Sequence, residues 1–458
     1  MDTAPSAWTL VAAYLGLFVG LVDANAVNLA LPAVRDDLGG AMTGAQWTVD
    51  VYNVAFASVL LSAGALGDRI GRRRVLRIGL TLFTTASIGC AAAPTLPVLL
   101  SFRVAQGVGA ASMLPQGLAI AAAAFPGGAG RARATAAWAT AAALSTAVGP
   151  ILGGTLTDVA GWRSIFWLNV PVGLIALALS FRYLPESQNP EARRADVAGQ
   201  SLSMVALATL TVVLVEGRRL GPAWTAALAG LAVAATAAFV RWERRTAEPL
   251  MPPALFRGRR LVAALIATFA MTFGIYGLLL VNSFAFQQER GESAVATAMW
   301  FLPMPLTYLV AIPAVRALAE RTGPRAPMIA GLLTMASAMA VYAAVGPRAR
   351  LGALEVAFVL AGAGLALTTG PAVGAALDGV PPARAGLASG VVNSARLVGI
   401  TVGVAVLGSA MAAVGGEPGA RVAMAVAAGV QSAGALAALW MSRTNTSADA
   451  EAERMCHA

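Results

Sequence analysis

Long uncharged stretches alternate along this chain with short segments rich in Arg, Pro and Gly. Residues 261–286 run for 26 positions without a charge, and residues 328–346 for 19. About 20 apolar residues carry a helix across the hydrocarbon core of a bilayer. Because lipid offers no partner to the backbone, only helices or closed barrels span it, and the alternating ten-residue strands of a barrel are absent. The pattern therefore predicts an all-α integral membrane protein.

Fourteen apolar segments are long enough to span a membrane, and the sequence predicts fourteen transmembrane helices. Pro, Gly and charged residues gather between them, as is typical of turns and loops. The predicted helices cover residues 9–33, 46–66, 75–94, 96–124, 135–157, 164–184, 199–216, 223–240, 261–286, 294–316, 327–346, 352–376, 385–413 and 422–441.

A weak internal repeat divides these helices. Gly64–Arg74 reads G-A-L-G-D-R-I-G-R-R-R and Ala314–Arg325 reads A-V-R-A-L-A-E-R-T-G-P-R, each after an even-numbered helix. Repeated halves are typical of transporters that alternate access around a central site. We predict two six-helix bundles with an inserted pair. The predicted divisions are an N-terminal bundle (1–184), a linker with two membrane helices (185–260), a C-terminal bundle (261–441) and a cytoplasmic tail (442–458).

The distribution of Arg predicts the orientation. All 32 basic residues are Arg, and the formal net charge is +10. With the N-terminus inside, the inner loops and the tail hold 22 Arg and the outer loops hold eight, while Arg103 and Arg396 lie within helices. Such an excess of positive charge marks the cytoplasmic side, so we expect both termini in the cytoplasm. Because the Arg residues are dispersed among loops, a nucleic-acid partner is not expected.

Composition narrows the function further. The chain is 58% hydrophobic and 12% charged, whereas a soluble domain carries about 25% charged residues. The two Cys, at positions 90 and 456, cannot form a disulfide framework. The only His, His457, lies near the C-terminus, and the absence of Lys excludes a Walker-type ATPase loop. We therefore expect no cofactor, no metal and no catalytic residue.

The loop between the second and third predicted helices combines Gly with charge. Gly lets helix ends approach closely, and Asp68 can pair with Arg or with a helix N-terminus. A contact of this kind can break and reform, so we interpret the loop as a conformational latch; the alternative is a basic loop that only fixes topology. The latch residues are Gly64, Asp68, Arg69, Gly71, Arg72 and Arg73.

This loop resembles the G-x-L-a-D-r-x-G-r-r motif of the major facilitator superfamily. The match covers Gly64, Leu66, Asp68, Arg69, Gly71, Arg72 and Arg73. The resemblance implies a membrane transporter that works by alternating access.

Two ionisable residues inside predicted helices are candidates for proton coupling. An Arg in the membrane is costly without a partner and is a functional candidate by default, and Arg103 lies in an R-v-x-q-G-x-G segment similar to helix four of proton-coupled facilitators. Asp23 lies near the middle of the first helix, at the acid position of the family's helix-one motif. The alternatives are an Arg that reaches the membrane surface and an Asp with a structural role.

Two further charges stay open at this point. Asp50, in W-T-V-D-V-Y of the second helix, could attract a cationic substrate or relay protons, or it could be an interfacial Asp at the outer rim. Arg396 lies in a segment similar to the family's helix-thirteen motif and could pair with a carboxylate. No acid lies within the tenth or thirteenth predicted helix, so strong selection for multivalent cations is not expected.

The fifth predicted helix contains a cluster of Gly around a Pro. Pro150 removes a backbone hydrogen bond and kinks the helix, and its Gly neighbours permit close packing on one side. The cluster resembles the G-P-x-x-G-G antiporter motif, which marks exporters; a fortuitous cluster is the alternative. The motif residues are Gly149, Pro150, Gly153 and Gly154. Residues 161–173, G-W-R-S-I-F-W-L-N-V-P-V-G, are similar to the signature of the fourteen-helix drug:proton antiporters.

Together these features predict proton-coupled efflux of hydrophobic or amphipathic small molecules, such as drugs or antibiotics, by a monomer in the bacterial inner membrane. Its expected partners are the small-molecule substrate, protons and the lipid bilayer. Two alternatives remain. An importer of a small metabolite should lack the antiporter motif, and a non-transporting membrane sensor should not need Asp23.

Overall fold

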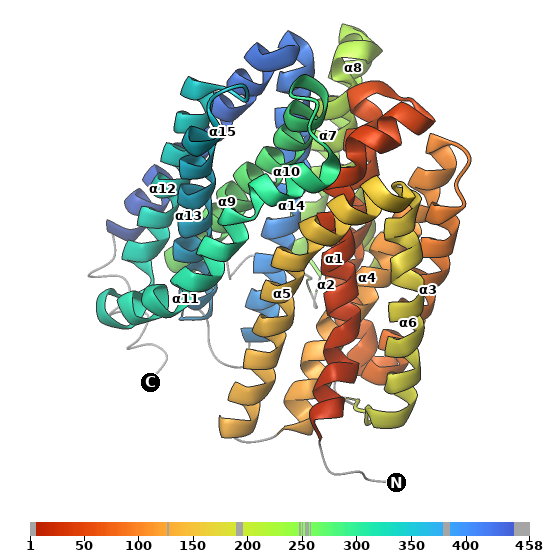
Figure 1. Ribbon diagram of the computed structural model, residues 1–458. Helices are drawn as coiled ribbons and strands as arrows, with labels where there is room; N and C mark the ends of the chain where they lie inside the picture. Colours follow the sequence, from red (N-terminus) through yellow and green to blue (C-terminus); the bar gives the residue numbers. More distant parts are fainter. Residues whose placement is uncertain are drawn as a thin grey trace.

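A computed structural model describes residues 6–125, 128–188, 196–246, 258–378 and 385–443, together with residues 249, 251 and 256. Its regular structure is entirely helical in these residues (Figure 1). The all-α prediction is therefore confirmed. Residues 444–458, which make up most of the predicted tail, lie outside the described residues.

Six helices form the first part of the chain. They are α1 (Ala7–Leu38), α2 (Ala41–Ile70), α3 (Arg72–Ala91), α4 (Leu96–Ala124), α5 (Gly128–Ala160) and α6 (Arg163–Tyr183). α1 packs on α5 and α6, and α4 lies between α2 and α3. The turn between α1 and α2 is only two residues long, because Gly39 and Gly40 adopt φ angles of 75° and 90° that are open to glycine. As a result α2 begins at Ala41, five residues before the predicted start at 46.

The next two helices lie at the periphery. They are α7 (Val197–Leu220) and α8 (Pro222–Glu243), which pack on each other, and α7 also contacts α2 and α14 (Figure 1). Large apolar side chains on α8 face outward, with Trp224 68% and Val233 70% exposed. Such a surface suits contact with lipid rather than water.

The last part begins with a long central helix. The elements are α9 (Arg259–Phe284), the π-helical turn η2 (Ala285–Glu289), α10 (Ala294–Phe301), α11 (Pro303–Thr322), α12 (Arg325–Val345), α13 (Leu351–Asp378), α14 (Ala385–Val414) and α15 (Gly416–Arg443). α9 packs on α13, α14 and α15. The predicted helix over 294–316 is broken at Leu302, because Pro303 and Pro305 have no N–H to continue the backbone ladder.

Most helices of the described chain could span a membrane. Eleven helices in these residues are long and apolar enough to cross a bilayer, or twelve if the bent α2 is included. α3 is not among them, because Arg72, Arg73, Arg74 and Arg77 lower its hydropathy. The chain is thus a polytopic membrane protein, while the count of fourteen spans and the position of the termini stay predictions.

The N-terminal and C-terminal helix sets meet at the end of α1 that lies away from the N-terminus (Figure 1). There Arg35 donates a 2.7 Å hydrogen bond to Gln288, and Gln287 donates to the carbonyl of Leu29. The Asp158 carboxylate, at the end of α5, accepts from the first two backbone N–H groups of α10 at 3.0 and 2.8 Å. Anions are favoured at a helix N-terminus, so Asp158 joins the two sets by capping a helix of the other set.

Candidate functional site

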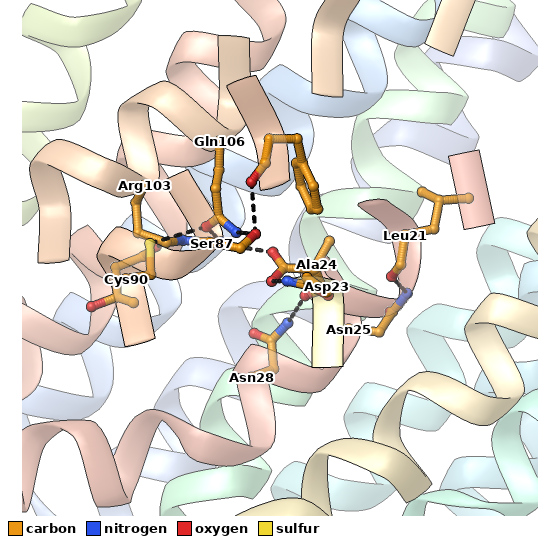
Figure 2. A network of polar contacts seen from close by, with 12 residues as sticks. Leu21, Asp23, Ala24, Asn25, Asn28, Ser87, Cys90, Arg103 and Gln106 are labelled. Carbon is orange, nitrogen blue, oxygen red and sulfur yellow. Dashed lines mark hydrogen bonds and ion pairs between the residues drawn. The ribbon is translucent and has the colours of Figure 1, made fainter. Parts of the chain in front are cut away.

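A buried ion pair lies in the centre of the first helix set (Figure 2). Arg103 of α4 donates through Nη1 to Oδ2 of Asp23 on α1 at 2.6 Å, and the two side chains are only 1% and 0% exposed. Asn169 of α6 donates to the other carboxylate oxygen of Asp23 at 2.7 Å. Both oxygens of the carboxylate are therefore satisfied, which is what a charge buried among membrane helices requires.

The guanidinium of Arg103 is held from several sides. It donates to the Thr48 carbonyl of α2 at 3.0 Å and to Oε1 of Gln106 at 2.8 Å. Gln106 in turn donates to Ser87 of α3 at 2.8 Å. The ring of Tyr52 lies 4.4 Å from the guanidinium carbon, a distance at which a cation and an aromatic face attract. Four helices thus fix the position of one charge.

Close helix packing makes this network possible. At Gly107 an added Cβ would clash with the Tyr52 carbonyl on α2, and at Gly109 it would lie 2.8 Å from the backbone nitrogen of Phe83 on α3. α4 therefore approaches both neighbours more closely than a larger residue allows. This proximity brings Arg103 within reach of α1 and α2, and Gln106 within reach of α3.

A cavity adjoins the ion pair and is bounded by both helix sets. Arg103 forms part of its wall, and on the opposite side lie Tyr276 of α9 and Arg396 of α14. The remaining lining comes from α1 (Gly16, Leu17, Gly20, Leu21, Ala24), α2 (Val49, Tyr52, Asn53, Phe56), α4 (Ala110, Met113, Leu114) and α14 (Leu397, Ile400). A mostly apolar lining with a few polar groups is typical of small-molecule sites. The cavity volume is about 30 Å³ in this conformation, so a drug-sized molecule, which occupies about 300–1,000 Å³, requires the two helix sets to move apart.

Asp50 lies apart from this ion pair. The earlier start of α2 places it nine residues inside the helix, where it is 0% exposed. Asp50 is therefore buried among the helices, and both interpretations of its role stay predictions. Neither carboxylate oxygen of Asp50 has a hydrogen-bond partner among the described residues, in contrast to Asp23.

The predicted pairing of Arg396 with a carboxylate is not found. Within the described part of the chain its guanidinium forms no salt bridge and donates no hydrogen bond, and only its backbone carbonyl is used, by Thr272. The side chain is partly exposed at the cavity wall.

The Gly–Pro cluster of α5 lies where α5 packs against α1 and against the start of α10. Added Cβ atoms at Gly149 and Gly153 would lie 2.7 Å from Asn25 Cβ and 2.5 Å from the Ala26 carbonyl, both on α1. At Gly154 a Cβ would lie 2.6 Å from the Ala294 carbonyl at the start of α10, in the other helix set. Pro150 lies inside α5 between these contacts.

The loop between α2 and α3 is held within the first helix set. Asp68 pairs with Arg72 at 2.7 Å, and Arg73 lies 3.5 Å from Glu186, just after α6. Gly71, at φ 110°, makes the turn between the helices. Gly64 has open space on its Cβ side, with Pro115 of α4 at 3.9 Å, and Arg69 is exposed. The contacts described for this loop do not reach the C-terminal set.

Sequence reasoning missed several members of the polar network, among them Asn169, Gln106 and Ser87, and also Cys90, which donates to Oε1 of Gln106 at 3.3 Å (Figure 2). Asn169 lies in the middle of an apolar helix, immediately before V-P-V-G, and a polar residue at that depth was an available signal. Gln106 lies three residues after Arg103, so it shares a helix face with it. Ser87 gave no comparable signal, because Ser and Thr are frequent along α3.

The chain is similar to known transporters along most of its length. It matches the Major Facilitator Superfamily over residues 13–404 and 265–454, and it belongs to this family. It is 39% identical over 412 residues to multidrug resistance protein Stp of Mycobacterium tuberculosis, covering 88% of this chain and 76% of that one. It is 35% identical over 408 residues to drug efflux pump JefA of the same organism, covering 88% and 80%.

A solved structure shares the fold. A crystal structure of a POT family transporter in complex with a thioalcohol-conjugated peptide superposes with a TM-score of 0.71, covering 94% of this chain and 96% of that one at 15% identity. At that identity the likeness concerns the fold alone. With the family and the apolar helices together, this chain is a multi-pass transporter of the bacterial inner membrane.

Proposed function

We propose that this protein exports hydrophobic or amphipathic small molecules, drugs or antibiotics among them, in exchange for protons. The observation that carries the proposal is the fully buried Asp23–Arg103 pair at the wall of a cavity bounded by both helix sets. The names of its relatives, a multidrug resistance protein and a drug efflux pump, support the substrate class and the direction.

The ion pair offers a physical route to coupling. A proton on Asp23 would remove the negative charge that balances Arg103, in a site where Arg103 is 1% exposed. Arg keeps its charge under all conditions relevant to proteins, and an uncompensated buried charge is strongly unfavourable. Proton binding therefore favours a conformation in which Arg103 finds another partner or water. A ligand that binds two conformations unequally shifts their populations, and here the ligand is the proton.

Asp50 is proposed as a second proton-binding residue. It is fully buried on α2, and its carboxylate has no hydrogen-bond partner among the described residues. An ionised carboxylate without a partner is costly to bury, and a bound proton removes that charge. α2 packs on α14 of the other helix set, so the charge on Asp50 would act near the contact between the sets.

Alternating access would use the contacts already described. The predicted topology has fourteen spans, arranged as two bundles with an inserted pair, and both termini in the cytoplasm. In this orientation the contacts through Asp158, Gln287 and Gln288 close the outer end. The Gly residues of α5 allow tight closure against α1 and α10. The loop after α2 would act as the latch of the inner end, engaging the C-terminal bundle when the transporter faces outward.

Proton coupling is tested in everted membrane vesicles energised by respiration. A pH-sensitive fluorophore reports proton release as dyes and antibiotics are added. We expect substrate-dependent proton release from the wild-type protein and none from the double variant Asp23→Asn/Arg103→Gln, which keeps the site neutral. The double variant should still exchange labelled substrate down its gradient, because exchange needs no proton. Glu320→Gln, which removes an exposed pair with Arg316, is the matched control and should resemble wild type.

Two outcomes would contradict the proposal. Proton release that persists in the double variant would remove Asp23 from the coupling step. Absence of proton release with every compound, together with uphill uptake of a metabolite, would identify an importer.

A further inference from the structure

Arg396 is an unbalanced charge within the membrane-spanning part of the chain. It lies on α14 and lines the cavity between the helix sets. No carboxylate lies within salt-bridge distance of it among the described residues, and its guanidinium donates no hydrogen bond there. Arg103, on the opposite wall, has a carboxylate, a carbonyl and an amide oxygen as partners. Because a membrane Arg normally faces water or a partner, the contrast between the two residues requires an explanation.

The charge of the cavity as a whole is positive. Of the described residues that line it, none is Asp or Glu. The nearest acid in the network, Asp23, has both of its oxygens occupied by Arg103 and Asn169. Among the described residues, the charge of Arg103 is therefore balanced by a carboxylate and the charge of Arg396 is not. A cationic molecule in this cavity would meet repulsion without a compensating carboxylate.

Other polar groups of the cavity can add hydrogen bonds. The side chains of Tyr52, Asn53 and Tyr276 line it and form no hydrogen bond with another described residue. Apart from Arg103, the wall provided by α1 and α4 is apolar and includes Leu17 and Met113. The cavity thus has two cationic groups, of which Arg103 pairs with Asp23 and Arg396 pairs with no described carboxylate, together with a few hydrogen-bonding groups and a broad apolar face.

We propose that the transported molecule is an amphipathic organic anion whose carboxylate, or a similar oxyanion, pairs with Arg396 while its apolar body lies against α1 and α4. This inference rests on the proposed function, because it assumes that the cavity is the transport site. The planar guanidinium presents a fork of N–H donors that matches the two oxygens of a carboxylate. Pairing would also balance the charge for which the described part of the chain supplies no carboxylate.

A matched set of probes tests the charge requirement. The probes are a dansyl-labelled medium-chain carboxylate, its primary amide and the corresponding primary amine, which share one apolar body. Binding to the purified protein in lipid nanodiscs is followed by dansyl fluorescence. We expect the wild type to bind the carboxylate about tenfold more tightly than the amide, as a charge-assisted pair implies, and to bind the amine most weakly.

Substitutions assign the effect to the side chain. Arg396→Gln should abolish the preference for the carboxylate and leave the affinity for the amide unchanged, whereas Arg396→Lys should keep part of the preference. Tyr276→Phe, which removes one hydroxyl from the same wall, should keep the preference for charge and serves as the control for local structure. All variants are compared only if they elute as monodisperse protein with the thermal stability of wild type.

Three results would overturn the inference: equal binding of the carboxylate and the amide by the wild type, tighter binding of the amine, or an equal loss for both probes in Arg396→Gln. Failure of the proposed function has a different signature. In that case no probe would release protons from energised vesicles, although the carboxylate could still bind in a manner that depends on Arg396.

Discussion

Neutralising one member of the buried ion pair should lower the stability of the protein, and the loss should be larger for Asp23 than for Arg103. In Asp23→Asn the shape is kept, but the neutral amide has a single oxygen for Arg103 and Asn169, and the guanidinium of Arg103, whose side chain is 1% exposed, loses its counter-charge. Breaking a buried pair by removing one partner costs about 3–5 kcal/mol of unfolding free energy. Because Arg103 cannot lose its proton, nothing relieves this cost in the folded protein.

Arg103→Gln should cost less, because the stranded carboxylate of Asp23 can become neutral by binding a proton and still accept from Asn169. The double variant Asp23→Asn/Arg103→Gln removes both charges, so part of the loss should be recovered, about 1–3 kcal/mol as the interaction term of the cycle. The stability order expected is wild type, then the double variant and Arg103→Gln, with Asp23→Asn lowest.

Equilibrium unfolding of purified protein in mild detergent, followed by tryptophan fluorescence, measures this order. Glu320→Gln is the control, since the Arg316–Glu320 pair is 81% and 65% exposed, and it should change stability by less than about 1 kcal/mol. The reasoning is refuted if Asp23→Asn is no more destabilising than Glu320→Gln, or if the double variant loses as much as both single variants together.

Two further predictions concern the contacts of α5. Gly153→Ala places a Cβ 2.5 Å from the Ala26 carbonyl, so it should lower the unfolding free energy by about 1–3 kcal/mol through overpacking and abolish transport. The control Gly230→Ala, whose Cβ meets nothing within 4 Å, should leave stability and transport intact in the same unfolding and vesicle assays. Equal effects of the two variants would show that the close approach of α5 to α1 is unimportant. Asp158→Asn removes the charge that caps α10 across the two helix sets, so the distance between spin labels at the ends of α5 and α10 should lengthen. Ser293→Ala, which removes a cap local to α10, should leave that distance unchanged. An unchanged distance in Asp158→Asn would show that Asp158 does not contribute to closure of the outer end.

The hydrophobic pattern predicted the helices well, because helix length in a membrane is set by the bilayer. The segment predicted at 96–124 coincides with α4. The error arose where backbone geometry decides the boundary, because the Gly39–Gly40 turn lengthened α2 toward its N-terminus. The segment predicted at 294–316 lies within one candidate span, Ala294–Thr322, which a turn at Leu302 interrupts between α10 and α11.

The candidate site was predictable only as a set of separate residues. Asp23 and Arg103 each stood out as charges in apolar segments, but their contact joins positions 80 apart in the chain, and no local spacing encodes it. The unpartnered state of Arg396 and of Asp50 was equally hidden, because it depends on what the neighbouring helices do not provide. Tertiary packing, rather than pattern, decides which buried charges are balanced.

The unbalanced charge of Arg396 has an electrical consequence. If the exported molecule is a monoanion and one proton enters in exchange, each cycle moves the equivalent of two positive charges into the cell. One charge crossing 100 mV corresponds to about 2.3 kcal/mol, so the membrane voltage alone supplies about 4.6 kcal/mol per cycle at 100 mV. At about 1.4 kcal/mol for each factor of ten, this supports a concentration ratio on the order of a thousandfold without any pH difference. A neutral molecule exported through the same cavity would be driven by half of that voltage term.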